Sequence, residues 1–192
     1  MTIYSKNHKI PEQKIITKFE HFWPGLTQNN FWDRQICGGY MTLPKTFPLL
    51  SQYMDNLEKG GALSSTYLSL WANTFDLPCV EVRDEELMAM ESGFSGQRPV
   101  DTWKKRMKSL QKWGFIESIS GTREFQFIIL PNPHVVVRKI HTDGKELYEI
   151  EKRKKIYNII ISKDIDVKGN GFVTYDEING KHNPTLRIKK RK

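Results

Sequence analysis

The 192-residue sequence predicts a mixed α+β fold in which short helices precede a β-hairpin, and three observations support this class. Apolar residues recur at steps of three and four between residues 48 and 113, the spacing of one helix face. Two stretches rich in β-branched and aromatic residues, Phe115 to Ile119 and Phe125 to Leu130, then favour strands. Glycine and proline residues separate these segments, where helices and strands normally end.

Three parts are expected along the chain: residues 1–47 as an N-terminal arm, residues 48–130 as a folded domain, and residues 131–192 as a C-terminal extension. The arm carries aromatic residues without a helical or strand period: Phe19, Phe22, Trp23, Phe31, Trp32 and Tyr40. Because such rings bury large apolar areas, we expect most of them to pack on the following domain.

Two helices are predicted at the start of the domain. The first begins at Pro48 and runs to about Glu58, where Gly60 and Gly61 stop it. The second is capped by Ser64 or Ser65 and ends near Asp76. Its inner face is predicted to hold Leu68, Trp71, Ala72 and Phe75. A short β-like stretch, Val80 to Arg83, follows.

Two further helices meet across a tight turn. Asp84 is a good N-cap for an acidic helix that ends at Gly93, with Leu87 and Met90 predicted on its inner face. Pro99 is then expected as the first residue of a helix that runs to Trp113, with Gly114 as its left-handed cap. Spacing on this helix predicts a buried stripe of Trp103, Met107 and Leu110.

Turn chemistry at Ser120-Gly121-Thr122-Arg123 predicts a hairpin between the two strands. The sequence after Asn132-Pro133 is open to two interpretations, since Val135 to Val137 favour a strand while Asn-Pro as cap and first residue favours a helix. We favour the helix. A charged helix from about Lys145 to Ile160 and, after Asp166, short strands and turns are expected next. The basic tail Leu186 to Lys192 either crosses a phosphate backbone or stays mobile.

Charge is sorted between neighbouring helices in this chain of formal net charge +8. Six acids and a single base lie between Asp76 and Glu91, whereas Arg98 to Lys112 carries six bases and one acid. The lysines of the second segment, Lys104, Lys105, Lys108 and Lys112, fall on the side opposite the buried stripe. Like charges four residues apart repel one another, so a negative partner is expected to offset them.

Three short runs resemble a known superfamily: Asp84 to Leu87, Arg98 to Val100, and Leu110 to Ile116. At these residues the segment Leu63 to Leu130 resembles the winged helix-turn-helix proteins, among them bacterial regulators and plasmid or phage replication and maintenance proteins. The resemblance implies that the helix Pro99 to Trp113 enters the major groove of DNA and that the hairpin is the wing.

On this interpretation the residues that read bases are Gln97, Arg98, Asp101, Thr102 and Lys105. Phosphate contacts are expected from Lys104, Lys108 and Lys112, and Arg123 suits a phosphate or the minor groove. The expected partner is double-stranded DNA, and the expected role is that of a transcriptional regulator or a replication, partition or maintenance factor of a mobile element. A homodimer through the arm or the helix after Asn132 is compatible with it.

Other functions remain open. The winged helix is alternatively a protein-protein interaction adaptor without DNA binding, or a binder of RNA. The segment Asp166 to Glu177 resembles an EF-hand calcium loop, but Lys168 stands where an oxygen ligand is needed, so a glycine-rich turn is expected. Neither a catalytic motif nor a cofactor or small-molecule site is evident, and an enzyme is not expected.

The remaining expectations concern cysteines, histidines and location. Cys37 and Cys79 lie in no metal-binding spacing and are predicted to be buried, reduced thiols. His134 and His141 lack further ligands nearby in the sequence and are predicted to be polar surface residues rather than metal ligands. No apolar run approaches the roughly 18 residues of a membrane span, and Met1 to Ile10 is polar, so a cytoplasmic protein is expected.

Overall fold

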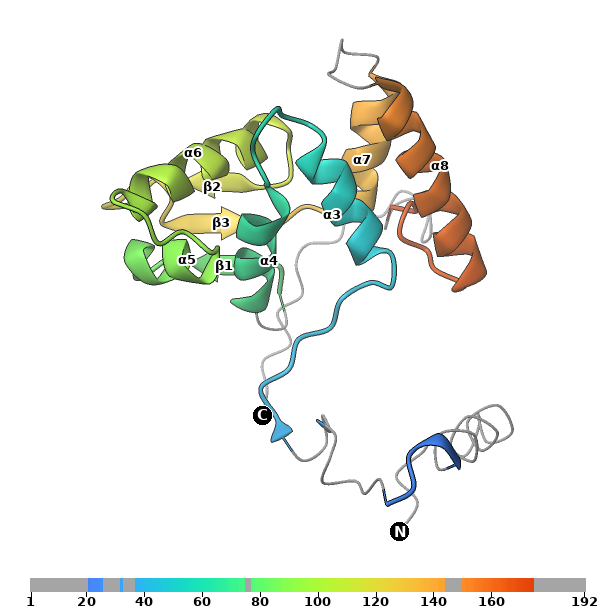
Figure 1. Cartoon of the computed structure of the whole chain (residues 1–192). Coiled ribbons are helices and arrows are strands. Elements are labelled where there is room, and N and C mark those ends of the chain that lie inside the picture. The colour runs from blue at the N-terminus through green and yellow to red at the C-terminus, as the bar shows by residue number, and fades with distance from the viewer. Residues whose placement is uncertain (1–20, 26–31, 33–36, 75–76, 144–149, 175–192) are drawn as a thin grey trace, which may run out of the picture. The chain divides into compact units, whose positions relative to one another are not determined.

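The computed structural model in Figure 1 describes residues 21–25, 32, 37–74, 77–143 and 150–174. The chain divides into two compact units, Met1–Thr42 and Leu43–Lys192. In the second unit the described residues form helices α3 to α8 and a three-stranded antiparallel sheet, which confirms the α+β class. None of the helices described is long and apolar enough to cross a membrane.

The described aromatic side chains of the first unit are exposed. Phe22, Trp23, Trp32 and Tyr40 keep between 52% and 62% of their surface accessible. They contact one another in pairs, Phe22 with Trp23 and Trp32 with Tyr40, in edge-to-face geometry. Phe19 and Phe31 lie outside the described residues. Packing of the arm on the domain therefore stays a prediction.

Helix α3 (Phe47–Asp55) and helix α4 (Ser64–Ala72) are joined by a turn that a carboxylate closes. The prediction that Ser64 or Ser65 caps α4 is wrong. Asp55, at the end of α3, accepts hydrogen bonds from the backbone N–H of Leu63 at 2.7 Å and of Ser64 at 2.8 Å. Since the first N–H groups of a helix have no partner within it, this carboxylate takes the place of a local serine cap.

The buried face of α4 differs from the predicted one. Its buried residues are Thr66, Tyr67, Ser69 and Leu70. Leu68 and Trp71 are only half-buried and Ala72 is exposed, while Phe75 lies outside the described residues. The helix packs against α3, α5 and α6. Because the polar residues Thr66 and Ser69 belong to the buried side, the apolar pattern alone pointed to the wrong face.

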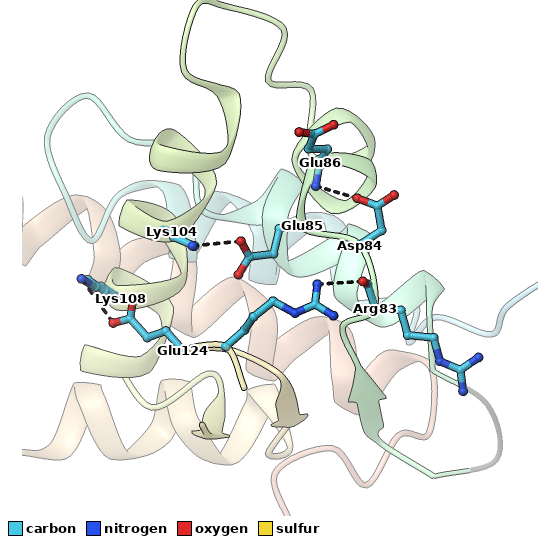
Figure 2. A network of polar contacts seen from close by, with 8 residues as sticks. Arg83, Asp84, Glu85, Glu86, Lys104, Lys108 and Glu124 are labelled. Carbon is cyan, nitrogen blue, oxygen red and sulfur yellow. Dashed lines mark hydrogen bonds and ion pairs between the residues drawn. The ribbon is translucent and has the colours of Figure 1, made fainter. Parts of the chain in front are cut away.

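Strand β1 (Cys79–Glu81) leads into helix α5 (Glu85–Glu91). The predicted N-cap is confirmed, because Asp84 accepts hydrogen bonds from the N–H of Glu86 at 2.9 Å (Figure 2) and from the N–H of Leu87 at 3.1 Å. The predicted inner face is wrong. Met88 and Ala89 are the buried residues of α5, whereas Leu87 and Met90 are 49% and 71% exposed. This seven-residue helix packs against α4 and α6, and those contacts cover its Met88 side.

Helix α6 (Pro99–Lys112) matches its prediction closely. Trp103, Met107 and Leu110 are fully buried. Gly114 has a φ of +79°, which favours glycine, and the Phe115 N–H bonds to the Leu110 carbonyl at 2.9 Å. The chain thereby leaves the helix and enters the hairpin with Phe115 and Ile116 in the core.

The hairpin comprises β2 (Glu117–Ile119) and β3 (Phe127–Ile129), and the sheet order is β1-β3-β2. Val80, Ile128 and Ser118 stand opposite one another in the register, and the first two are buried. On the other face Ile119, Phe127 and Ile129 are 70%, 46% and 45% exposed. Cys79 shares this face and is exposed, as is Cys37, so the prediction of buried thiols is wrong.

Beyond the sheet the chain forms helix α7 (Pro133–Thr142) and helix α8 (Ile150–Asp166). The helical interpretation of Asn132-Pro133 is confirmed, since the Asn132 side chain accepts a hydrogen bond from the His134 N–H at 3.0 Å. Helix α8 continues past the predicted end at Ile160. Both helices pack against α3 and against each other (Figure 1). The predicted beginning of α8 near Lys145 and the basic tail from Leu186 lie outside the described residues.

His134 is buried, contrary to its predicted surface position. Its Nε2 lies 2.6 Å from Thr46 Oγ1, and its ring meets Phe172 edge to face. Burial lowers the pKa of His134, and the nearby Asp164 carboxylate opposes that shift. Asp164 in turn accepts a hydrogen bond from the Gly171 N–H at 3.1 Å, so these contacts hold the segment after α8 against α7 and the start of α3.

The segment after α8 forms turns over its described residues, 167–174. Lys168 adopts a φ of +56° in the first of them. Residues 175–177, the end of the calcium-like motif, lie outside the described residues. Over the described part of the chain, no three His, Cys, Asp or Glu side chains are grouped to hold a metal ion.

Candidate nucleic-acid interface

The candidate interface is the exposed side of α6 together with the turn of the β2–β3 hairpin. Helix α6 follows α5 across a turn, and its buried stripe faces the core. The residues just before and within its first turn, Gln97, Arg98 and Asp101, are exposed. Thr102 is half-buried, and its hydroxyl donates to the Arg98 carbonyl at 3.1 Å. These four predicted base-reading residues therefore lie at one end of the helix, and the fifth, Lys105, is exposed about halfway along it.

Three contacts fasten the hairpin to its surroundings. Glu124 Oε1 lies 3.3 Å from Lys108 Nζ, and Ser118 Oγ lies 3.3 Å from Gln111 Oε1, so two contacts join the hairpin to α6. Arg123 donates from Nη1 to the Arg83 carbonyl at 2.7 Å, beside the end of β1. The hairpin turn is thereby held next to the exposed side of α6 (Figure 2).

Three of the predicted DNA-contacting lysines form ion pairs within the chain. Lys104 Nζ lies 2.9 Å from Glu85 Oε2 and Lys108 Nζ lies 3.3 Å from Glu124 Oε1. Figure 2 shows both pairs. Lys112 lies 3.3 Å from Glu58. The negative partners expected for these three lysines are therefore carboxylates of the chain itself, which lie on α5, on the hairpin turn and on the turn after α3. Sequence reasoning missed these pairs because each acid lies on a different element from its lysine.

The three pairs differ in exposure. The side chains of Lys104 and Glu85 are 32% and 15% exposed, whereas those of Lys108 and Glu124 are 62% and 47% exposed. Lys104 is therefore directed towards α5, and its pair belongs to the packing of α5 on α6. Lys108 and Glu124 face solvent. Over the described part of the chain, neither Arg98 nor Lys105 forms an ion pair, and both are exposed.

Glu58 anchors the C-terminal end of α6. Its carboxylate accepts hydrogen bonds from Ser109 Oγ at 2.8 Å and from Trp113 Nε1 at 3.0 Å, in addition to the Lys112 contact. Burial raises the pKa of Glu58, but these hydrogen bonds outweigh burial and hold the pKa below its usual value. Lys112 Nζ also lies 4.9 Å from the centre of the Trp113 ring. Lys112 thus contacts both Glu58 and Trp113, while 64% of its side chain is exposed.

A second exposed surface lies on the opposite side of the sheet. Ile119, Phe127 and Ile129 form an apolar patch there, which we call the outer sheet face. Ser118 on the other side of β2 contacts α6, so the outer sheet face points away from that helix. The uninterrupted apolar run Phe127 to Leu130 has no alternation of apolar and polar residues that would have shown which of its side chains are exposed.

Comparisons of the chain with protein-family models, curated proteins and solved structures give no match.

Proposed function

We propose that this chain is a DNA-binding protein of the winged helix-turn-helix type, with α6 in the major groove and the β2–β3 hairpin as its wing. The order α4, β1, α5, α6, β2, β3 and the sheet order β1-β3-β2 support the proposal. They give the helix pair followed by a hairpin that the sequence resemblance implies. The buried stripe of α6 leaves its opposite side free to face a groove.

The observation that carries the proposal is that the exposed side of α6 and the hairpin turn lie side by side and that both carry basic side chains. The Lys108–Glu124 contact joins them. A duplex in contact with α6 would meet Arg98 at the beginning of the helix, Lys105 about halfway along it, and Arg123 on the hairpin turn. Gln97 and Arg98 suit bidentate contacts to adenine and guanine, and the lysines suit phosphates.

The ion pairs within the chain indicate which lysines of α6 are available for contact with DNA. Lys104 is committed to Glu85 and is assigned here to the fold. Lys105 has no competing acid in the described structure, and we assign it the main phosphate contact in place of the base-reading role that the resemblance implies. Lys108 and Lys112 are available once their pairs open. As its biological role we propose the one that the sequence resemblance implies, which is regulation of transcription, or replication, partition or maintenance of a mobile element. A homodimer is compatible with this role.

The test is a salt series of binding to random and genomic duplexes, comparing the full chain with Lys105→Ala. Each lost phosphate contact lowers the magnitude of the slope of log affinity against log salt by about 0.9. Lys155→Ala is the matched control. Lys155 is an exposed lysine of α8, and its replacement changes the net charge by the same amount as Lys105→Ala. A folded protein that binds no duplex at about 50 mM salt would overturn the proposal.

A protein-protein interaction adaptor is the second candidate. The outer sheet face favours it, because exposed isoleucine and phenylalanine side chains grouped on one surface are typical of interaction sites. Internal pairing of three lysines also removes part of the argument for a polyanionic partner. If the salt series finds no duplex binding, substitution of Phe127 and Ile129 by serine tests this candidate through the loss of a captured protein partner.

A further inference from the structure

Glu124 occupies a position that a DNA phosphate would also need. It stands on the hairpin turn, and its carboxylate lies 3.3 Å from Lys108 Nζ on the exposed side of α6. An approaching duplex that contacts both α6 and the turn would bring a phosphate to the same ammonium group. The carboxylate and the phosphate cannot both take up the same contact with Lys108, and two anions close together repel each other.

Exposure separates this pair from the other two. Glu85 is only 15% exposed and lies behind Lys104, between α5 and α6. Glu58 accepts two further hydrogen bonds, from Ser109 and Trp113, which hold it in the fold. Glu124 has 47% of its side chain exposed, and within the described residues its carboxylate makes an ion pair with Lys108 and no other polar contact. Exposed pairs of this kind add little stability and open readily.

Resting on the proposed function, we propose that Glu124 is a built-in competitor of the DNA backbone for Lys108. Its carboxylate weakens the binding of every duplex alike, because it opposes a phosphate contact and touches no base-reading residue. The consequence is low affinity for non-specific DNA at a given salt concentration, which leaves the contacts of Gln97 and Arg98 to decide where the protein stays bound.

The experiment measures binding of the full chain to a random duplex over a salt series, for the wild type and for Glu124→Gln. Without the carboxylate, Lys108 gains a phosphate contact. Affinity is expected to rise about three- to tenfold at 100 mM salt, and the magnitude of the salt slope is expected to grow by about 0.9. The exposed position of Glu124 keeps the variant folded, which an unchanged thermal midpoint checks.

Two controls separate the contact from a general effect of charge. Glu117→Gln changes the net charge equally, but Glu117 is an exposed residue of the outer sheet face, away from α6, and its variant is expected to rise less than twofold. In a Lys108→Ala background, Glu124→Gln is expected to change affinity less than twofold, since the competed lysine is gone.

Each outcome decides a separate point. A rise in Glu124→Gln that matches the rise in Glu117→Gln, or that persists undiminished without Lys108, would overturn the competitor role while leaving DNA binding in place. If no variant binds duplex even at low salt, the proposed function fails and the competitor role fails with it. A rise confined to Glu124→Gln and dependent on Lys108 supports the inference.

Discussion

The carboxylate of Glu58 accepts a 3.0 Å hydrogen bond from the indole N–H of Trp113, across a sequence separation of 55 residues. Together with the Ser109 bond at 2.8 Å, it ties the turn after α3 to the end of α6. The orientation of α6, and with it the candidate interface, therefore depends on an acid outside the helix pair. Two consequences can be measured.

Glu58→Ala is expected to lower the free energy of unfolding by about 1–3 kcal/mol, because Ser109 and Trp113 lose their acceptor in a partly buried site. Urea unfolding followed by tryptophan fluorescence measures it. Lys112→Ala is the matched comparison, since it removes the exposed ion pair and the contact with the Trp113 ring but keeps the Ser109 and Trp113 hydrogen bonds, and it is expected to cost less than about 1 kcal/mol. Equal losses in the two variants would contradict the anchoring role.

The pH dependence of the same carboxylate has a definite sign. The pKa of Glu58 in the folded protein lies below its usual value of 4.5, so the folded state favours the charged form. Its stabilising contribution is complete above pH 4.5 and is lost as the pH falls through the folded pKa. Glu58→Gln is therefore expected to lose less stability than the wild type on acidification below pH 4.5.

The positions where helices begin and end could be predicted from the sequence, because they depend on local interactions. Asp84 as a cap, Pro99 as a first residue and Gly114 as a left-handed stop all act through their own backbone neighbours, and the structure confirms each. The stripe on α6 was equally predictable, because one side of that helix is buried and its apolar residues keep a strict period.

The wrong predictions for α5 and for His134 depend on contacts between residues that are distant in the sequence. The sequence pattern predicts Leu87 and Met90 in the core, but α5 is too short for its period to identify the side that α4 and α6 cover. The sequence predicts a surface position for His134, whereas Thr46 and Phe172, which are far away in the sequence, contact its ring in the structure. The lysines of α6 lie on the side opposite the buried stripe, as predicted. Their ion-pair partners could not be predicted, because Glu58, Glu85 and Glu124 belong to three other segments of the chain.

Asp55→Ala tests the carboxylate that caps α4 from outside. Two backbone N–H groups and the Ser64 hydroxyl lose their acceptor, so the free energy of unfolding is expected to fall by about 1–2 kcal/mol. Asp55→Asn retains an oxygen acceptor and is expected to lose less than half as much. Chemical denaturation of the three proteins at neutral pH makes the comparison. Equal stability of the alanine variant and the wild type would show that the cap is dispensable.

His134 predicts a loss of stability on mild acidification. Burial lowers its pKa in the folded protein, so between the unfolded value of 6.5 and the lower folded value the unfolded state binds more protons. Stability from this residue is complete above pH 6.5 and falls as the pH drops towards the folded pKa. Asp164 and Thr46 face the ring in the folded state, and the Asp164 charge limits the shift.

Urea midpoints measured from pH 7.5 to pH 5 check this expectation, with His134→Gln as the variant. Glutamine keeps a hydrogen-bonding group near Thr46 but does not titrate, so the dependence on pH is expected to become shallower. His141 also has a lowered pKa, through burial and Lys154, so part of the dependence is expected to remain. His141→Gln then serves as the parallel control. An unchanged pH profile in His134→Gln would contradict the assignment.

Lys104 and Lys105 are adjacent in the sequence but are expected to respond oppositely to truncation. Lys104→Ala leaves the mostly buried Glu85 carboxylate without its 2.9 Å partner, and a stability loss of about 1–2 kcal/mol is expected. Its effect on duplex affinity is expected to stay below twofold. Lys105 is exposed and unpaired in the described structure, so Lys105→Ala is expected to change stability by less than about 0.5 kcal/mol and to weaken duplex binding about three- to tenfold. Thermal unfolding and duplex titrations on the same samples separate the two effects, because the ion pair with Glu85 acts in the free protein and a phosphate contact acts only in the complex. If both variants lose affinity equally with unchanged stability, Lys104 leaves Glu85 for DNA, and its assignment to the fold is wrong.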